Sequence, residues 1–208
     1  MNKNVEIKEL VKNTLIMLAI TLIAGFILGF VYEITKDPIA NMEEKARQEA
    51  NAAVFVNASS FEEQNFDKDQ MLKCLEDDFE NVEITEVLVA KDSGGGQIGY
   101  VFEITSHEGF GGDIVFRMGV QNDGTVNAIA ITSISETAGL GMRAEEVIVP
   151  QFFERRADSF EVTKTGAALD NQIDAISSAT ITSKAFVNGV NAGLLYLREV
   201  LGGGVVNE

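Results

Sequence analysis

Hydroxyl and carboxyl side chains gather between residues 174 and 184, in the run Asp-Ala-Ile-Ser-Ser-Ala-Thr-Ile-Thr-Ser-Lys. Thr182 or Ser183 is expected to cap a following helix, so that Thr180 would lie just outside the helix N-terminus. The unpaired N–H groups and the positive dipole end at such a place favour a phosphate. On these residues alone, an ordinary helix cap is the simpler interpretation. The helix is predicted from apolar residues at three- and four-residue steps: Phe186, Val190, Leu194, Leu197 and Leu201.

Two glycine-containing loops are further candidates for a binding site. Residues 136–142 (Glu-Thr-Ala-Gly-Leu-Gly-Met) follow a predicted strand, and their two glycines allow a close backbone approach or a positive φ. Residues 107–113 (His-Glu-Gly-Phe-Gly-Gly-Asp) precede another strand. The second loop does not fit a dinucleotide fingerprint, because no helix pattern follows it. Each loop alone is explained by turn chemistry.

Together these segments resemble the motifs of the FMN-binding domain family, which includes subunits of Rnf electron-transport complexes and of the sodium-translocating quinone reductase. The family's attachment motif is an acid followed by Ser/Thr-Gly-Ala-Thr, and its last threonine carries FMN through a phosphoester. Asp174 and residues 177–180 match this motif, except that Ser178 replaces the usual glycine. By this resemblance Thr180 is the attachment residue, with Thr182 and Ser183 as open alternatives. The attachment site would further include Ser177, Ser178, Ala179 and Asp174.

The loop at residues 136–141 resembles the family's Glu-Thr-Pro-Gly-Leu-Gly loop, with Ala138 in place of proline. The segment Gly109 to Gly112 resembles its Gly-Tyr/Phe-Gly-Gly segment. Two motifs in the family's order are far more specific than either alone. Lys184 is one helical turn beyond Thr180 and is the nearby cation. The expected cofactor contacts beyond the attachment motif are therefore Glu136, Thr137, Gly139, Leu140, Gly141 and Lys184.

The resemblance implies an electron-relay subunit of a membrane-bound, ion-translocating ferredoxin:NAD oxidoreductase of the Rnf type. A threonine hydroxyl is a poor nucleophile without a base, so a separate flavin transferase is expected to attach the FMN. The sequence has no nicotinamide fingerprint and no iron–sulfur cysteine set, so we expect no turnover by the chain alone. The alternatives are a membrane-tethered extracytoplasmic binding module without a redox role, and the covalent-FMN subunit of a sodium-translocating quinone reductase.

Composition excludes several other classes of function. The 208 residues carry a net charge of −16, which disfavours binding to nucleic acid. Cys74 is the single cysteine, so the chain forms no internal disulfide. His107 is the single histidine, and no cysteine–histidine cluster has metal-ligand spacing. We therefore expect no metal site.

The N-terminal part is predicted to be a membrane anchor. Residues 14–32 carry no charge, and these 19 residues would form about 28 Å of helix, close to the thickness of a bilayer core. Lys3, Lys8 and Lys12 precede the run, whereas Lys36 is the one lysine shortly after it. This bias favours a cytoplasmic N-terminus and an FMN domain on the outer side of the membrane. Gly25 and Gly29 could let a partner's membrane helix pack closely.

The remainder predicts an α+β fold, in which an antiparallel sheet with flanking helices forms the FMN-binding domain. Asp37-Pro38 is expected to end the membrane helix, and a separate charged helix is expected from about Ala40 to Phe55. A short helix is expected between residues 67 and 78. Four alternating segments predict strands at residues 82–90, 97–106, 114–120 and 125–135. The expected division is a cytoplasmic N-terminus (1–13), a transmembrane helix (14–34), a helical lead-in (35–80), the FMN-binding domain (81–201) and a tail (202–208).

Overall fold

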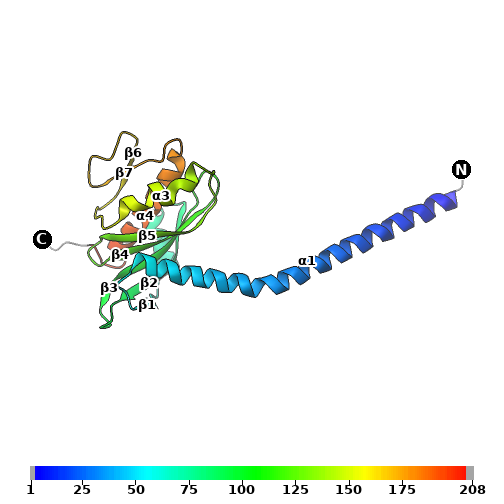
Figure 1. The fold of residues 1–208 in the computed structure, drawn as a ribbon, viewed down its shortest axis with the longest axis horizontal. Coiled ribbons are helices and arrows are strands. Elements are labelled where there is room, and N and C mark those ends of the chain that lie inside the picture. Colours follow the sequence, from blue (N-terminus) through cyan, green and yellow to red (C-terminus); the bar gives the residue numbers. More distant parts are fainter. Residues whose placement is uncertain (1–2, 205–208) are drawn as a thin grey trace. The chain divides into compact units, whose positions relative to one another are not determined.

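The computed structural model describes residues 3–204 and divides the chain into two compact units, Met1–Ala46 and Arg47–Glu208. The described residues of the first unit, 3–46, belong to the long helix α1 (Lys3–Val54), whose last turns are part of the second unit. The second unit is an antiparallel sheet with further helices (Figure 1). This arrangement confirms the predicted α+β class with an N-terminal apolar helix.

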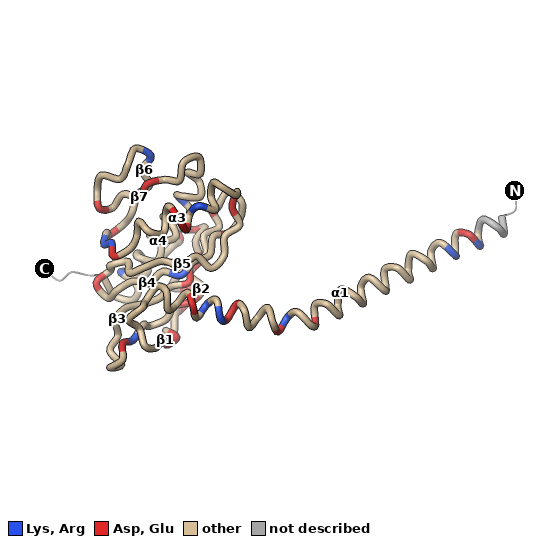
Figure 2. The backbone as a smooth tube through the Cα atoms, viewed as in Figure 1, with Lys and Arg blue, Asp and Glu red and all other residues tan. Residues whose placement is uncertain are grey.

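The N-terminal unit has the composition of a membrane anchor. No charged residue lies between Lys12 and Glu33, and Figure 2 shows this stretch as the longest uncharged part of α1. Its apolar side chains are exposed, for example Phe26 and Leu28. Within the described residues, α1 is the one helix long and apolar enough to cross a membrane. An apolar helical surface of this length favours an apolar environment such as lipid.

Pro38 lies inside α1, so the expectation that Asp37-Pro38 ends the helix and that a new helix begins near Ala40 is wrong. Proline removes one backbone hydrogen bond and crowds the carbonyl of Ile34, four residues earlier. The residues that follow include strong helix formers such as Met42 and Ala46. Their preference for helix outweighs this single local defect.

The sheet of the second unit is a five-stranded meander in which every strand is antiparallel to its neighbours in the chain. The four strands predicted from alternation are confirmed. The edge strand at residues 60–63 was not predicted, because four residues with three exposed side chains give little periodic signal. The strands are β1 (Ser60–Glu63), β2 (Val82–Lys91), β3 (Gln97–Ser106), β4 (Ile114–Gln121) and β5 (Val126–Ile134).

Helices α4 (Thr180–Glu199) and α2 (Lys68–Leu75) pack on one face of this sheet. The contact is close because two glycines of α4 face large side chains of β4. A Cβ at Gly189 would lie 2.9 Å from Phe116 Cε1, and a Cβ at Gly193 would lie 2.4 Å from Met118 Cε. Phe116 also stacks on Phe186 of α4, with the ring centroids 4.5 Å apart. This packing fixes α4, and with it the segment that begins at Thr180.

The other face of the sheet receives the last turns of α1. Arg117 of β4 is fully buried there, and its Nη1 donates to Asn51 Oδ1 of α1 at 2.7 Å. The Nη2 of Arg117 donates to the carboxylates of Glu86 and Glu103, which balance its charge. Buried charges are tolerated when they are paired in this way. The end of α1 is therefore an integral part of the second unit.

The chain between β5 and α4 forms a series of short elements that lead to the start of α4. The pair β6 and β7 is parallel, and three-residue strands of this kind gave no sequence signal. The elements are η1 (Gly141–Arg143), α3 (Ala144–Val147), η2 (Val149–Phe152), β6 (Glu161–Thr163) and β7 (Gln172–Asp174).

Candidate functional site

Thr180 is the first residue of α4, and Ala179 is the N-cap. The predictions that Thr182 or Ser183 caps the helix and that Thr180 lies outside it are therefore wrong. No side chain caps this helix, so the N–H groups of its first turn have no side-chain acceptor. An uncapped N-terminus of a 20-residue helix favours an anion by its free donors and its dipole. Thr180 is half-buried at this position.

The two neighbouring hydroxyl residues have structural environments. Ser183 is fully buried, and its Oγ accepts the N–H of Ile176 at 3.0 Å and donates to the carbonyl of Ala179 at 2.9 Å. Thr182 is also buried, with 1% of its surface exposed. The hydroxyl of Ser183 thus satisfies a main-chain donor from inside the helix, where it holds the segment before Thr180 in place.

Ser178 has a φ of 65°, in the left-handed region that favours glycine. Among the described residues, it shares a positive φ with only one other non-glycine residue, Glu154. This conformation gives a physical reason for the glycine in the family motif at this position. Ser178 adopts this conformation at the cost of local strain.

Asp174 ends β7 and is held through its main chain. The side-chain amide of Gln151 donates to the Asp174 carbonyl at 3.1 Å and accepts the Asp174 N–H at 2.7 Å. This pairing connects η2 to the segment between β7 and α4. It fixes where the chain turns toward Thr180.

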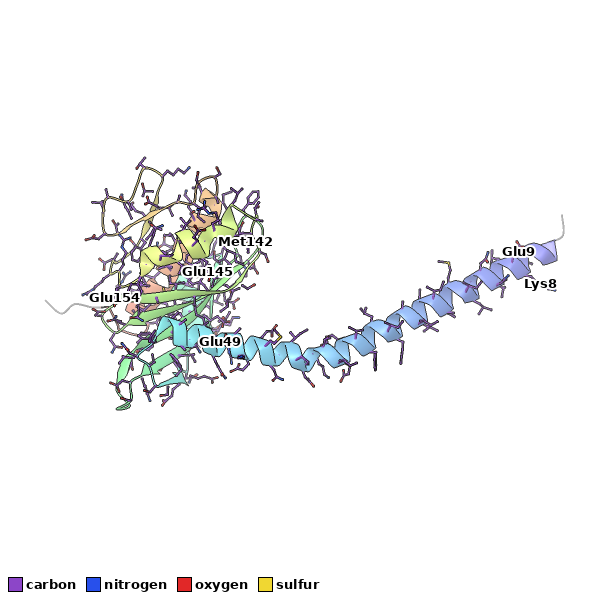
Figure 3. The ribbon with its side chains drawn as sticks, in the orientation of Figure 1. Lys8, Glu9, Glu49, Met142, Glu145 and Glu154 are labelled. Carbon is purple, nitrogen blue, oxygen red and sulfur yellow. The ribbon has the colours of Figure 1, made fainter. Side chains whose placement is uncertain are left out.

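The loop at residues 136–142 packs directly against the N-terminus of α4. A Cβ at Gly141 would lie 2.7 Å from Glu136 Cβ and 2.8 Å from Thr182 Oγ1. The carbonyl of Thr137 accepts the N–H groups of Leu140 at 3.1 Å and of Met142 at 3.3 Å. Glycine at position 141 is therefore required by close approach. Met142 extends from the surface of the unit (Figure 3).

Glu136 connects this loop to the one at residues 107–113. Its Oε1 accepts the N–H of Phe110 at 2.7 Å. The Phe110 side chain is 70% exposed. Sequence reasoning did not place Phe110 in the site, although the Gly-Phe-Gly-Gly segment was the signal that could have done so.

These three segments enclose a cavity of about 360 Å³. It brings together seven of the eleven predicted site residues, the alternative Thr182, and two residues that were not predicted, Phe110 and Ile181. Asp174, Ser177, Gly139 and Lys184 lie outside its lining, and the side chain of Lys184 is exposed. The lining consists of Phe110, Glu136, Thr137, Leu140, Gly141, Ser178, Ala179, Thr180, Ile181 and Thr182.

The lining fits a phosphate-bearing aromatic group. The helix N-terminus at Thr180 supplies N–H donors for a phosphate. Phe110, Leu140 and Ile181 supply apolar surface for a planar ring system. Glu136 is the one ionisable side chain in the lining, and its charge is partly satisfied by the Phe110 N–H.

Comparison with known proteins identifies the family. Residues 109–195 match the FMN-binding domain, and residues 1–54 match the RnfG N-terminal region. The chain is 31% identical over 190 residues to the G subunit of the Na(+)-translocating ferredoxin:NAD(+) oxidoreductase complex of Acetobacterium woodii, covering 90% of this chain and 91% of that one. It is 33% identical over 183 residues to the proton-translocating counterpart of Clostridium ljungdahlii, covering 87% and 88%. The crystal structure of Shewanella oneidensis NqrC aligns over 54% of this chain and 57% of that one, with a TM-score of 0.45 and 16% identity.

Both bacterial relatives are matched along nearly their whole length, and both named regions occur in the expected order. The chain therefore belongs to the family of G subunits of Rnf-type ion-translocating oxidoreductase complexes.

Proposed function

We propose that this chain is the electron-relay subunit of a membrane-bound ferredoxin:NAD oxidoreductase complex of the Rnf type, and that it carries FMN through a phosphoester on Thr180. The relatives from Acetobacterium and Clostridium are named as subunits of such complexes. The observation that carries the assignment to Thr180 is its position as the first residue of an uncapped helix that opens into the cavity.

The neighbouring hydroxyls are less suited to attachment. Ser183 is fully buried, and its Oγ is already engaged with two main-chain groups. Thr182 is buried against Gly141. Thr180 is half-buried, lines the cavity and lies beside the free donors of the first helical turn, which favour the negative charge of a phosphodiester.

The bound FMN would supply the redox chemistry, and the protein would supply position and electrostatics. The N–H groups at the start of α4 would hold the phosphate. Leu140 and the backbone at Gly141 would lie beside the flavin, with Thr137 and Glu136 as the polar groups of the same wall. The carboxylate of Glu136 also holds the loop of Phe110 in place.

A separate flavin transferase is the proposed source of the phosphoester. A threonine hydroxyl needs a base to act as a nucleophile. The described lining of the cavity includes neither a histidine nor a lysine, and its one carboxylate, that of Glu136, already accepts the Phe110 N–H. The chain would therefore be a substrate for attachment, with a transferase supplying the base.

The proposed topology places the N-terminus in the cytoplasm and the FMN domain outside, with residues 14–34 in contact with lipid. Lys8 and Lys12 precede the uncharged stretch, and Lys36 with Glu33 follows it as an ion pair. Protease added to cells with a permeable outer surface should digest the FMN domain. Protection in such cells, with digestion only in inverted vesicles, would reverse the orientation.

The functional test uses the assembled complex. Thr180→Val should abolish ferredoxin-driven NAD reduction while the other membrane subunits remain assembled. Thr163→Val, at a half-buried position outside the cavity lining, is the matched control for the loss of a threonine hydroxyl. Full activity of the Thr180→Val complex would show that the proposed relay role is wrong.

A further inference from the structure

Three exposed apolar side chains of the second unit lie together in the lining of the cavity. Phe110 is 70% exposed, Ile181 53% and Leu140 37%, and all three line the same cavity. Exposed apolar side chains that lie together beside a cavity are typical of a ligand or partner site. Phe110 is the one aromatic residue in the described lining, and it is absent from the predicted set of cofactor contacts.

The loop that carries Phe110 is held firmly in place. A Cβ at Gly109 would lie 2.0 Å from the Gly112 carbonyl oxygen, and a Cβ at Gly111 would lie 2.4 Å from the Ser135 carbonyl oxygen. These glycines therefore serve close packing rather than freedom of movement. The Phe110 N–H is bound by Glu136, as described above.

Side-chain contacts hold both ends of the same loop. Glu108 Oε2 accepts the Asn188 Nδ2–H of α4 at 2.6 Å. His107 Nδ1 lies 2.9 Å from Asp113 Oδ1 across the base of the loop. Several independent contacts thus maintain Phe110 in an exposed position beside the helix that begins at Thr180.

We propose that Phe110 forms a contact surface for the isoalloxazine ring of an FMN attached to Thr180, and so positions that ring in the cavity. This inference rests on the proposed function. A planar aromatic ring gains free energy from packing against another aromatic ring beyond the burial of apolar area alone. Leu140 and Ile181 line the cavity with Phe110, and a ring in contact with all three would cover the apolar surface that is now exposed.

The chemistry of phenylalanine makes this contact measurable. Tryptophan and tyrosine donate an electron to a photoexcited flavin in contact with them and quench its fluorescence, whereas phenylalanine does not. The chain has no tryptophan, and the described cavity lining holds no tyrosine. A tryptophan introduced at position 110 would therefore report contact with the ring directly.

The test uses the full-length chain purified in detergent after coexpression with a flavin transferase, with bound flavin quantified by mass spectrometry. Phe110→Trp should lower the fluorescence per bound flavin several-fold and shorten its lifetime. Phe110→Tyr is the more conservative second variant and should also quench. Phe153→Trp is the matched control, because Phe153 is 61% exposed and lies outside the cavity lining.

The outcomes separate this inference from the proposed function. Flavin that is bound to Thr180 but equally fluorescent in the Phe110→Trp, Phe110→Tyr and Phe153→Trp chains would overturn the contact with Phe110 alone. A chain that carries no flavin on any hydroxyl would overturn the proposed function and this inference together. Quenching confined to the variants at position 110 would establish the contact.

Discussion

The hydroxyl of Ser183 lies 3.0 Å from the amide nitrogen of Ile176 and accepts its hydrogen bond from within the first turn of α4. This bond closes the segment that leads into the helix, and both residues are buried. The bend before Thr180 is therefore shaped by a side chain that follows the proposed attachment residue in sequence. The segment that leads into Thr180 is therefore pre-formed by the fold of the protein.

Ser183→Ala should lower the stability of this segment. The buried N–H of Ile176 would lose its acceptor, which costs about 1–3 kcal/mol. In a domain of this size about 1 kcal/mol corresponds to a fall in Tm of roughly 2–4 °C. Thermal unfolding of the full chain measures the effect, with the exposed Ser177→Ala as control. An equal Tm for both variants would contradict the structural role of Ser183.

Ser178→Gly should make the protein more stable. Glycine removes the strain of about 1–2 kcal/mol that a Cβ causes in the left-handed region. Part of this gain is offset by the greater entropy of glycine in the unfolded chain, which leaves a net gain of about 0.5–1 kcal/mol. Ser177→Gly, at the preceding exposed residue without a positive φ, should lose stability instead. A lower Tm for Ser178→Gly would be inconsistent with the strain at this position.

Gly141→Ala and Gly139→Ala should differ in their effect on the cavity. A Cβ at Gly141 would press on Glu136 and Thr182, and such overpacking costs about 1–3 kcal/mol. Gly139 has a φ of 75° but open space around its Cα, so its substitution strains only the backbone. Gly141→Ala should therefore alter the absorption spectrum of bound flavin as well as the Tm. Gly139→Ala should alter the Tm alone. Identical flavin spectra for the unaltered chain and both variants would contradict the predicted effect of Gly141→Ala.

Much of the sheet could be predicted from sequence because β3 and β4 alternate apolar side chains toward one buried face, as in Phe116 and Met118. The start of α4 was predicted wrongly. Sequence patterns treat Ser183 as a cap, but tertiary contacts bury it and use its hydroxyl to hold Ile176. The continuity of α1 through Pro38 was also not predicted. Sequence reasoning considered the unfavourable effect of one proline but not the helix-forming residues on both sides of it.

The composition of the candidate site was only partly accessible to sequence reasoning. The motifs identified Thr180 and the loop from Glu136 to Gly141, which the fold brings to one cavity. Lys184 was included because it is one helical turn from Thr180, but that turn directs it to solvent. Phe110 was missed because its place beside Thr180 depends on how two distant loops meet through Glu136.

The central claim is that Thr180 carries FMN, and peptide mass mapping tests it most directly. The full chain would be coexpressed with a flavin transferase, digested and analysed by mass spectrometry, together with the Thr180→Val and Thr182→Val variants. We predict that the peptide containing Thr180 gains the mass of FMN in the unaltered chain and in Thr182→Val, and that this mass is absent from Thr180→Val. Flavin that remains covalently bound to the Thr180→Val chain, or that maps to Thr182 or Ser183 in the unaltered chain, would contradict the account.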